Sequence, residues 1–104
     1  MAQTFNGGFI VVTAVGFSAA TGAASARSAI PVDGSGNRPN VIRVAARNEC
    51  YFKIGDSSVT ATVNDILVQN ADAVLIQVPK AATHIAYIQG VAAGQINVVP
   101  LDNS

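Results

Sequence analysis

Hydrophobic and polar residues alternate along much of the second half of the chain, with a period of two. The stretch NVIRVAA, residues 40–46, is typical, because it places Ile42, Val44 and Ala46 on one side of an extended backbone. Successive side chains of a strand point to opposite faces of its sheet, so this period predicts a strand. No stretch of the second half keeps an apolar period of 3.6 residues for three turns, which argues against helices there.

The stretch CYFKIG, residues 50–55, has the same period. It predicts a second strand, whose inward face carries Cys50, Phe52 and Ile54. The polar residues 47–49 separate it from the first strand. A short polar turn between two alternating stretches is typical of a hairpin, so we expect these two strands to pair with each other.

Further strands are predicted by short runs that are rich in Val and Ile, most of which have a Gly or Pro at one end or next to it. These runs are residues 9–17, 59–63, 73–79, 83–89 and 94–101, of which 59–63 is a short strand or an edge. Close spacing and tight turns between the runs are typical of antiparallel all-β domains.

The first forty residues differ from the rest. Residues 18–29 have small side chains and nothing to anchor a core, so we expect an extended arm or loop. Residues 31–40, PVDGSGNRPN, predict a long turn or linker. We expect one domain, an all-β antiparallel β-sandwich or small barrel of about six to eight strands with an extended N-terminal arm. Residues 1–40 supply a strand, the arm and the linker, and residues 41–104 form the body.

Charge is scarce in this chain and evenly balanced. Six Lys and Arg residues are matched by six Asp and Glu residues, and charged residues make up 12% of the chain, against about 25% in a typical soluble domain. A zero net charge provides no field to attract nucleic acid or an anionic membrane, so neither is an expected partner. The uncharged residues 1–26 contain many polar side chains and no basic residue, so neither a membrane span nor a signal peptide is expected.

Candidate catalytic groups are few. Cys50 is the single cysteine, so no internal disulfide can form, and we expect it to be a buried small hydrophobic residue. His84 has no second His and no Cys at ligand spacing, so a metal site would need scattered Asp residues to converge. A catalytic pair of Cys50 and His84, oriented by Asp65 or Asn64, would join separate strands, and nothing local activates the thiol. We therefore expect no enzyme activity and no catalytic, metal-binding or cofactor-binding residues.

A resemblance is carried by the strand that ends CYFKIG, the pair Val78-Pro79, the stretch HIAYIQG and the closing GQINVVPL. In these features residues 41–101 resemble the small β-sandwich decoration, or cement, proteins of tailed bacteriophage capsids. The shared motifs are structural and not catalytic, and residues 1–40 match no motif of the group. The resemblance implies a virion structural protein, commonly a homotrimer, that binds the outer capsid surface and cross-links major capsid subunits.

The scarcity of charge fits such a role. A chain of this kind stays soluble when its apolar residues are internal, or when copies of itself or a partner cover part of its surface. The expected partners are the chain itself and the major capsid protein, on the capsid surface of a virion after synthesis in the host cytoplasm. The expected subunit or capsid interface residues are Phe5, Phe9, Phe17, Tyr51 and Tyr87. Packing inside their own core is the alternative for the three phenylalanines.

Two other functions stay open. The same composition suits another virion component, such as a subunit of a tail, a baseplate or a head-fibre base. A module that binds host glycans is the alternative from a different class. The chain has no Trp and only Tyr51 and Tyr87 to stack on a sugar ring, which is a small supply for a lectin.

Overall fold

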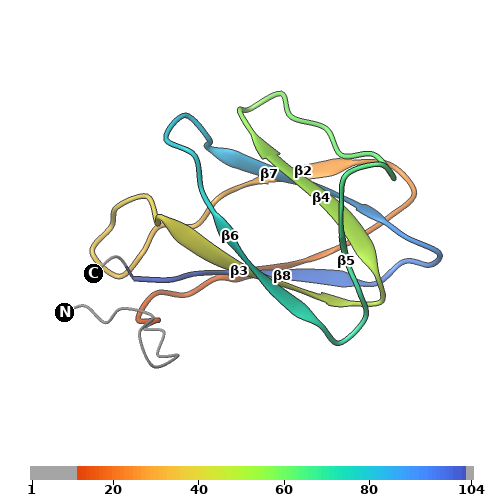
Figure 1. Ribbon diagram of the computed structural model, residues 1–104, viewed down its shortest axis with the longest axis horizontal. Coiled ribbons are helices and arrows are strands. Elements are labelled where there is room, and N and C mark those ends of the chain that lie inside the picture. The colour runs from red at the N-terminus through yellow and green to blue at the C-terminus, as the bar shows by residue number, and fades with distance from the viewer. Residues whose placement is uncertain (1–11, 103–104) are drawn as a thin grey trace.

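Two sheets make up the regular structure of the protein. The computed structural model describes residues 12–102. Within them lie the strands β1 (Phe17–Ala20), β2 (Ala26–Ala29), β3 (Val41–Arg47), β4 (Cys50–Gly55), β5 (Ile66–Val68), β6 (Ala73–Gln77), β7 (His84–Gln89) and β8 (Gln95–Pro100). Sheet A has the order β1-β8-β3-β6 and sheet B the order β2-β7-β4-β5, and all pairs are antiparallel. The sheets face each other as a β-sandwich (Figure 1), which confirms the predicted fold class.

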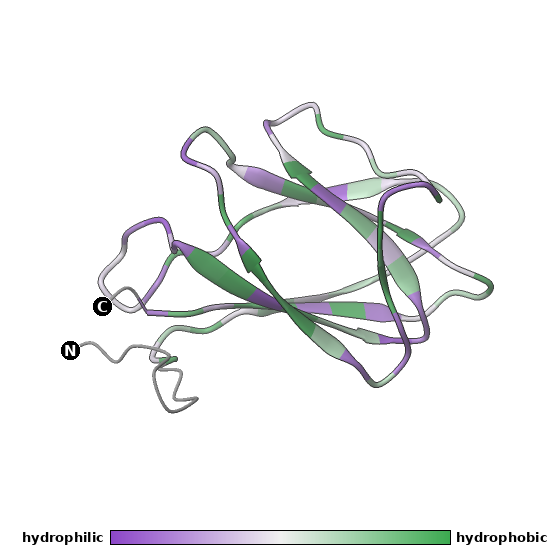
Figure 2. Ribbon diagram, viewed as in Figure 1, coloured by the Kyte–Doolittle hydropathy of each residue, from purple (hydrophilic) through white to green (hydrophobic). Residues whose placement is uncertain are grey.

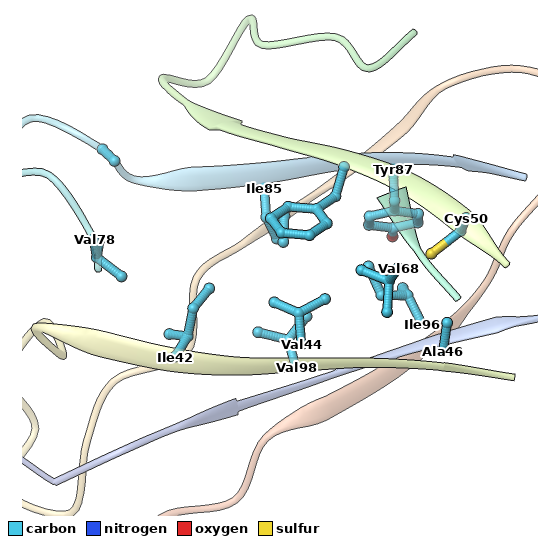
Figure 3. Packing of buried hydrophobic residues seen from close by; sticks show 12 residues of the cluster. Ile42, Val44, Ala46, Cys50, Val68, Val78, Ile85, Tyr87, Ile96 and Val98 are labelled. Carbon is cyan, nitrogen blue, oxygen red and sulfur yellow. The ribbon is translucent and has the colours of Figure 1, made fainter. Parts of the chain in front are cut away.

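The core lies between the two sheets and is built from the inward positions of the alternating strands. Ile42 and Val44 of β3 are fully buried, and so are Cys50 and Phe52 of β4, while Ile54 is half-buried. Figure 3 shows the side chains of both sheets meeting in this space. Figure 2 shows hydrophobic and hydrophilic residues alternating along the strands. The inward face predicted for residues 50–55 is therefore confirmed.

The predicted hairpin of β3 and β4 is wrong. β3 pairs with β6 and β8 in sheet A, whereas β4 pairs with β5 and β7 in sheet B. Residues 47–49 carry the chain from one sheet to the other, with Asn48 in the left-handed conformation at φ 67°. In a hairpin, the inward residues of both strands would lie on one sheet. The crossing instead places buried Ala46 and buried Cys50 on opposite walls of the same core.

The N-terminal part of the described chain also differs from its prediction. The strand expected at residues 9–17 is absent from residues 12–16 and begins only at Phe17, and residues 9–11 lie outside the described residues. Residues 18–29, expected as an arm or loop, contain most of β1 and all of β2, which pair with β8 and β7 of the same subunit. Small residues suit these edges, since a Cβ at Gly16 would lie 2.1 Å from the Val98 carbonyl oxygen.

The strand predicted at residues 59–63 does not form. Residues 56–65 make two turns instead, in which Val59 N donates to Asp56 O and Asp65 N donates to Thr62 O. Aspartate side chains in this loop bond nearby backbone N–H groups and so compete with strand pairing. The strands predicted at residues 73–79, 83–89 and 94–101 are confirmed as β6, β7 and β8.

The predicted turn at residues 31–40 is confirmed, and it carries the chain from β2 of sheet B to β3 of sheet A. Its centre is Asp33, which is 4% exposed. One carboxylate oxygen of Asp33 accepts hydrogen bonds from Ser35 N at 2.9 Å and Asn37 N at 3.0 Å. Gly36 has φ 81°, a conformation that glycine adopts without steric cost.

Candidate interaction surface

Positive and negative side chains occupy different parts of the fold. Four of the six cationic residues lie in strands, namely Arg27, Arg43, Arg47 and Lys53. All six acidic residues lie in the connections between or after strands, namely Asp33, Glu49, Asp56, Asp65, Asp72 and Asp102. The sheet faces are therefore positive wherever they carry charge.

The aspartates are used to hold the connections in shape. Each of the five accepts a hydrogen bond from a backbone N–H at 2.7 to 3.0 Å. Thr13 and then the Gly34 N–H lower the pKa of Asp102 by hydrogen bonding to its carboxylate. The N–H and hydroxyl of Ser58 lower the pKa of Asp56 in the same way. The aspartate carboxylates are thus engaged by backbone N–H groups close to them in the fold.

Two arginines of sheet A therefore have no acidic partner among the described residues. Within residues 12–102 no carboxylate forms an ion pair with Arg43 or Arg47. Both side chains project from β3 on the side opposite to Ile42, Val44 and Ala46. Their charges are therefore available to a group outside this subunit.

The outer side of sheet A surrounds these arginines with small and uncharged side chains, and we call it the arginine face. By register it comprises Ser18 and Ala20 of β1, Gln95, Asn97 and Val99 of β8, Val41, Arg43, Ala45 and Arg47 of β3, and Ala73, Leu75 and Gln77 of β6. Leu75 is 52% exposed. The arginine face thus combines two positive charges with uncharged side chains, both polar and apolar.

A hollow of about 270 Å³ lies beside Arg47 on this face. Its walls include Ser18, Ala45, Gln95 and Asn97. The Asn97 side-chain amide donates to the Ser18 hydroxyl at 3.1 Å, which fixes both groups. A guanidinium beside a polar hollow matches the geometry of a carboxylate, which can accept two parallel hydrogen bonds from it.

The outer side of sheet B is covered by the connection between β4 and β5. Ala61 N in this loop donates to Ser25 Oγ at 2.9 Å, and Arg27 donates to the Val59 carbonyl at 3.1 Å. Ala86 faces outward on β7 between Lys53 and Arg27, yet it is 0% exposed. Figure 1 shows this loop running over the upper sheet. Sheet B therefore offers less of its strand surface to a partner than sheet A does.

The aromatic residues expected at an interface are placed differently from one another. Tyr87 is 4% exposed and its hydroxyl lies 2.7 Å from Ser28 Oγ, so it belongs to the core and has no surface to offer a partner. Phe17 is half-buried and packs on the same core. Tyr51 is half-buried on the outer side of β4. Phe5 and Phe9 lie outside the described residues.

Sequence reasoning missed Arg43 and Arg47 as candidate site residues. The signal was present, because the alternation of residues 40–46 already places Arg43 on the face opposite to Ile42 and Val44. The missing observation was that the aspartates are engaged in their own turns, which only the hydrogen bonds show.

The candidate chemical groups do not converge. Cys50 pairs with Gln89 and His84 pairs with Gly55, so the two lie at opposite ends of the β4 and β7 pair, about 17 Å apart along the strands. Cys50 points inward, and burial raises the pKa of its thiol to about 11. Within residues 12–102, no three His, Cys, Asp or Glu side chains gather as they would around a metal ion. The same residues contain no helix long and apolar enough to cross a membrane.

Comparison with known proteins adds no relative. No family model, curated protein or solved structure matches this chain.

Proposed function

We propose that this chain is a structural interaction protein that attaches to an ordered protein lattice through the arginine face. In its specific form, the proposal is a decoration protein of a tailed bacteriophage capsid. Such a protein binds the outer capsid surface, cross-links major capsid subunits and associates with itself as a homotrimer. The observation that carries the proposal is the arginine face, on which neither Arg43 nor Arg47 forms an ion pair with a carboxylate within residues 12–102.

The chemistry of this face specifies the partner surface. Arg43 and Arg47 require carboxylates opposite them, because an arginine buried without a partner costs several kcal/mol in free energy. The small residues around them allow a flat protein surface to approach closely. A stable contact needs about 1,000 Å² or more of buried area. Repetition over a lattice then multiplies a modest contact into strong attachment.

A glycan-binding module is less well supported. Sugar rings bind against exposed aromatic faces, and the aromatic residues within 12–102 are Phe17, Tyr51, Phe52 and Tyr87. Phe52 and Tyr87 are buried, and Phe17 and Tyr51 are half-buried. A tail, baseplate or head-fibre role would use the same face, so location and not chemistry separates it from the capsid role.

The first experiment is the copy number of the chain in purified virus particles, measured by quantitative mass spectrometry against the most abundant shell protein. A ratio near one to one, or another simple fraction repeated over the whole shell, supports the capsid role. A total of only a few copies per particle supports a role at a tail or a vertex instead. Absence from particles overturns the virion proposal and leaves glycan arrays as the next assay.

A further inference from the structure

Glu49 differs from the five aspartates in the state of its carboxylate. Each aspartate side chain accepts a hydrogen bond from a backbone N–H. Within residues 12–102, the Glu49 carboxylate forms no hydrogen bond and no ion pair. Arg43 and Arg47 form no ion pair in the same part of the chain. The described fold therefore leaves one carboxylate and two guanidinium groups to bind something outside the subunit.

Glu49 lies immediately before β4 and faces the outer side of sheet B. Its carbonyl accepts the Gly90 N–H at 3.0 Å, which extends the pairing of β4 with β7 by one residue. Cys50 points into the core, so the alternation of the strand places Glu49 outward. The Glu49 side chain lies over Gly90, where an added Cβ would be 2.5 Å from its Cγ. Val91, next in the turn, is 86% exposed. The carboxylate thus lies beside an apolar tip.

Arg47 is two residues from Glu49, but the two side chains project from opposite sides of the molecule. β3 ends at Arg47 in sheet A, and β4 begins at Cys50 in sheet B. Packed sheets are about 10 Å apart, and both side chains point away from the space between them. Contact between these two charges therefore requires a second copy of the chain.

The hollow beside Arg47 is suited to one carboxylate. Its volume is about 270 Å³, and Arg47 is the one charged residue among its described lining. Gln95 lies directly opposite Arg47 on β8. Asn97 and Ser18 form the wall, held by the hydrogen bond from the Asn97 amide to the Ser18 hydroxyl. One guanidinium among uncharged polar groups matches a single negative charge, and a carboxylate can accept two parallel hydrogen bonds from it.

We propose that this hollow binds the Glu49 side chain of a second copy of the chain. Charge complementarity selects this occupant, because Glu49 is the acidic side chain that the described fold leaves without a partner. The inference rests on the proposed self-association and gives it a contact. It leaves Arg43 for the lattice, since Arg43 lies between Leu75 and Val99 in the middle of the arginine face.

The same contact defines a type of assembly. Glu49 and the hollow are different surfaces of the chain, so the contact is heterologous, and heterologous contacts form a ring when the rotation between copies allows it. Both surfaces lie at one end of the sandwich, where Figure 1 shows the passage from β3 to β4 and the turn between β7 and β8. A ring of three copies around an axis near this end agrees with the proposed homotrimer.

Charge reversal tests the contact by sedimentation equilibrium of the full chain over a range of concentrations. We expect Arg47→Glu and Glu49→Arg each to associate at least about tenfold more weakly, because each places like charges opposite one another. The double variant Arg47→Glu/Glu49→Arg restores opposite charges at every contact and should associate as the wild type does. Recovery in the double variant also shows that neither substitution prevents folding.

Arg43→Glu is the matched control for Arg47→Glu. It makes the same change of charge on the same face of β3, but Arg43 lies outside the hollow. Its self-association should equal that of the wild type. Equal weakening by Arg43→Glu and Arg47→Glu would show that overall charge controls association, and would overturn the inference.

Cross-linking identifies the two groups that meet. Arg47→Lys places an amine at the hollow, and a water-soluble carbodiimide joins an amine to a carboxylate that contacts it. Arg47→Lys should give products of dimer and trimer mass, whereas Arg47→Lys/Glu49→Gln should give no more than the wild type, whose Lys53 and Lys80 set the background.

Three results would overturn the inference: a wild-type chain that stays monomeric, a double variant as weak as the single variants, or cross-links confined to single chains. Binding of the same variants to shells is measured separately by co-sedimentation. Loss of shell binding by Arg43→Glu with normal self-association bears on the attachment to a lattice alone. Failure of the Glu49 contact therefore remains distinguishable from failure of the proposed attachment.

Discussion

The two sheets of this sandwich have the same number of strands and share one core, but their outer sides differ. The outer side of sheet B is crossed by residues 56–65, which bond to Ser25, just before β2, and to Arg27 of β2. Within residues 12–102, no connection is bonded across the outer side of sheet A, which carries Arg43 and Arg47 among mostly small side chains. Among the described residues, the outer side of sheet B is therefore partly covered within the subunit, and the outer side of sheet A is the side for which we propose a partner.

The two sheets also differ in how the few charged residues of the chain are used. Apolar burial between the sheets stabilises the fold, and the aspartates shape the connections. Neither task uses the arginines of sheet A. Exposed sheet surface with unpaired charge contributes little to the stability of an isolated domain. The proposed intermolecular contact would give this surface a physical role.

The largest effect is expected from a substitution in the core that the two sheets share. Phe52 of β4 is 0% exposed and packs between the sheets. Phe52→Ala should lower the free energy of unfolding by about 3–5 kcal/mol, because it removes apolar contacts and leaves a cavity. Urea or guanidinium unfolding measures this value. The neighbour Lys53 points outward, so Lys53→Ala should change the same quantity by about 0.5 kcal/mol or less, and equal losses would show that Phe52 is not central to the core.

The inner faces of the sandwich could be predicted from the sequence because they depend on local alternation. Residues 40–46 and 50–55 show a period of two, and the same residues are buried in the structure. The pairing of the strands could not be predicted in the same way. The polar residues 47–49 suit a hairpin as well as a crossing between sheets, and the choice depends on the distant partners β6, β7 and β8.

The candidate surface was less predictable for a related reason. An arginine on the outer face of a strand is common, and it becomes informative only when its possible carboxylate partners are engaged elsewhere. Asp65 illustrates the difficulty, because its sequence neighbours suggest a turn but do not show that its carboxylate accepts the Thr62 N–H at 2.7 Å. Tyr87 illustrates the converse, since an aromatic residue in an alternating stretch can face either side, and here it faces the core.

The next effect in size concerns the outer side of sheet A. We expect the double variant Arg43→Glu/Arg47→Glu to bind shells that lack the chain at least about a hundredfold more weakly, because it replaces two attractive charges with repulsive ones. Co-sedimentation of the full chain with such shells gives the dissociation constant. The free energy of unfolding should change little, since neither side chain forms an ion pair within residues 12–102.

The matched control for this variant is on the opposite sheet. Lys53→Glu changes charge by the same sign on the outer side of sheet B and should leave the affinity for shells unchanged. If Lys53→Glu weakens binding as much as the arginine variant, the attachment depends on overall charge and the arginine face has no special role. If neither variant weakens it, the attachment uses another surface.

A smaller effect is expected from the pH dependence of stability at Cys50. Burial raises the pKa of this thiol to about 11, whereas an exposed cysteine has a pKa of about 8.5. The thiol therefore contributes stability that is fully present below about pH 8.5 and is lost as the pH rises toward about 11. The loss should be about 2 kcal/mol by pH 10. Unfolding measurements from pH 8 to pH 11 should show it in the wild type and not in Cys50→Ala, and parallel curves for the two proteins would contradict the burial of the thiol.

The smallest effect tests whether the cover on sheet B is held by its hydrogen bonds. Ser25→Ala removes the hydroxyl that accepts the Ala61 N–H at 2.9 Å. The free energy of unfolding should fall by about 0.5–1.5 kcal/mol, the usual net value of one hydrogen bond, and hydrogen exchange of the Ala61 amide should become faster. Ser18→Ala is the matched control on the edge of sheet A, where the lost partner is the exposed Asn97 side-chain amide at 3.1 Å. That amide can bond water instead, so Ser18→Ala should lower the free energy of unfolding by less than Ser25→Ala does. An equal loss for both variants would mean that the two edges are held alike. The loop would then not distinguish the sheets.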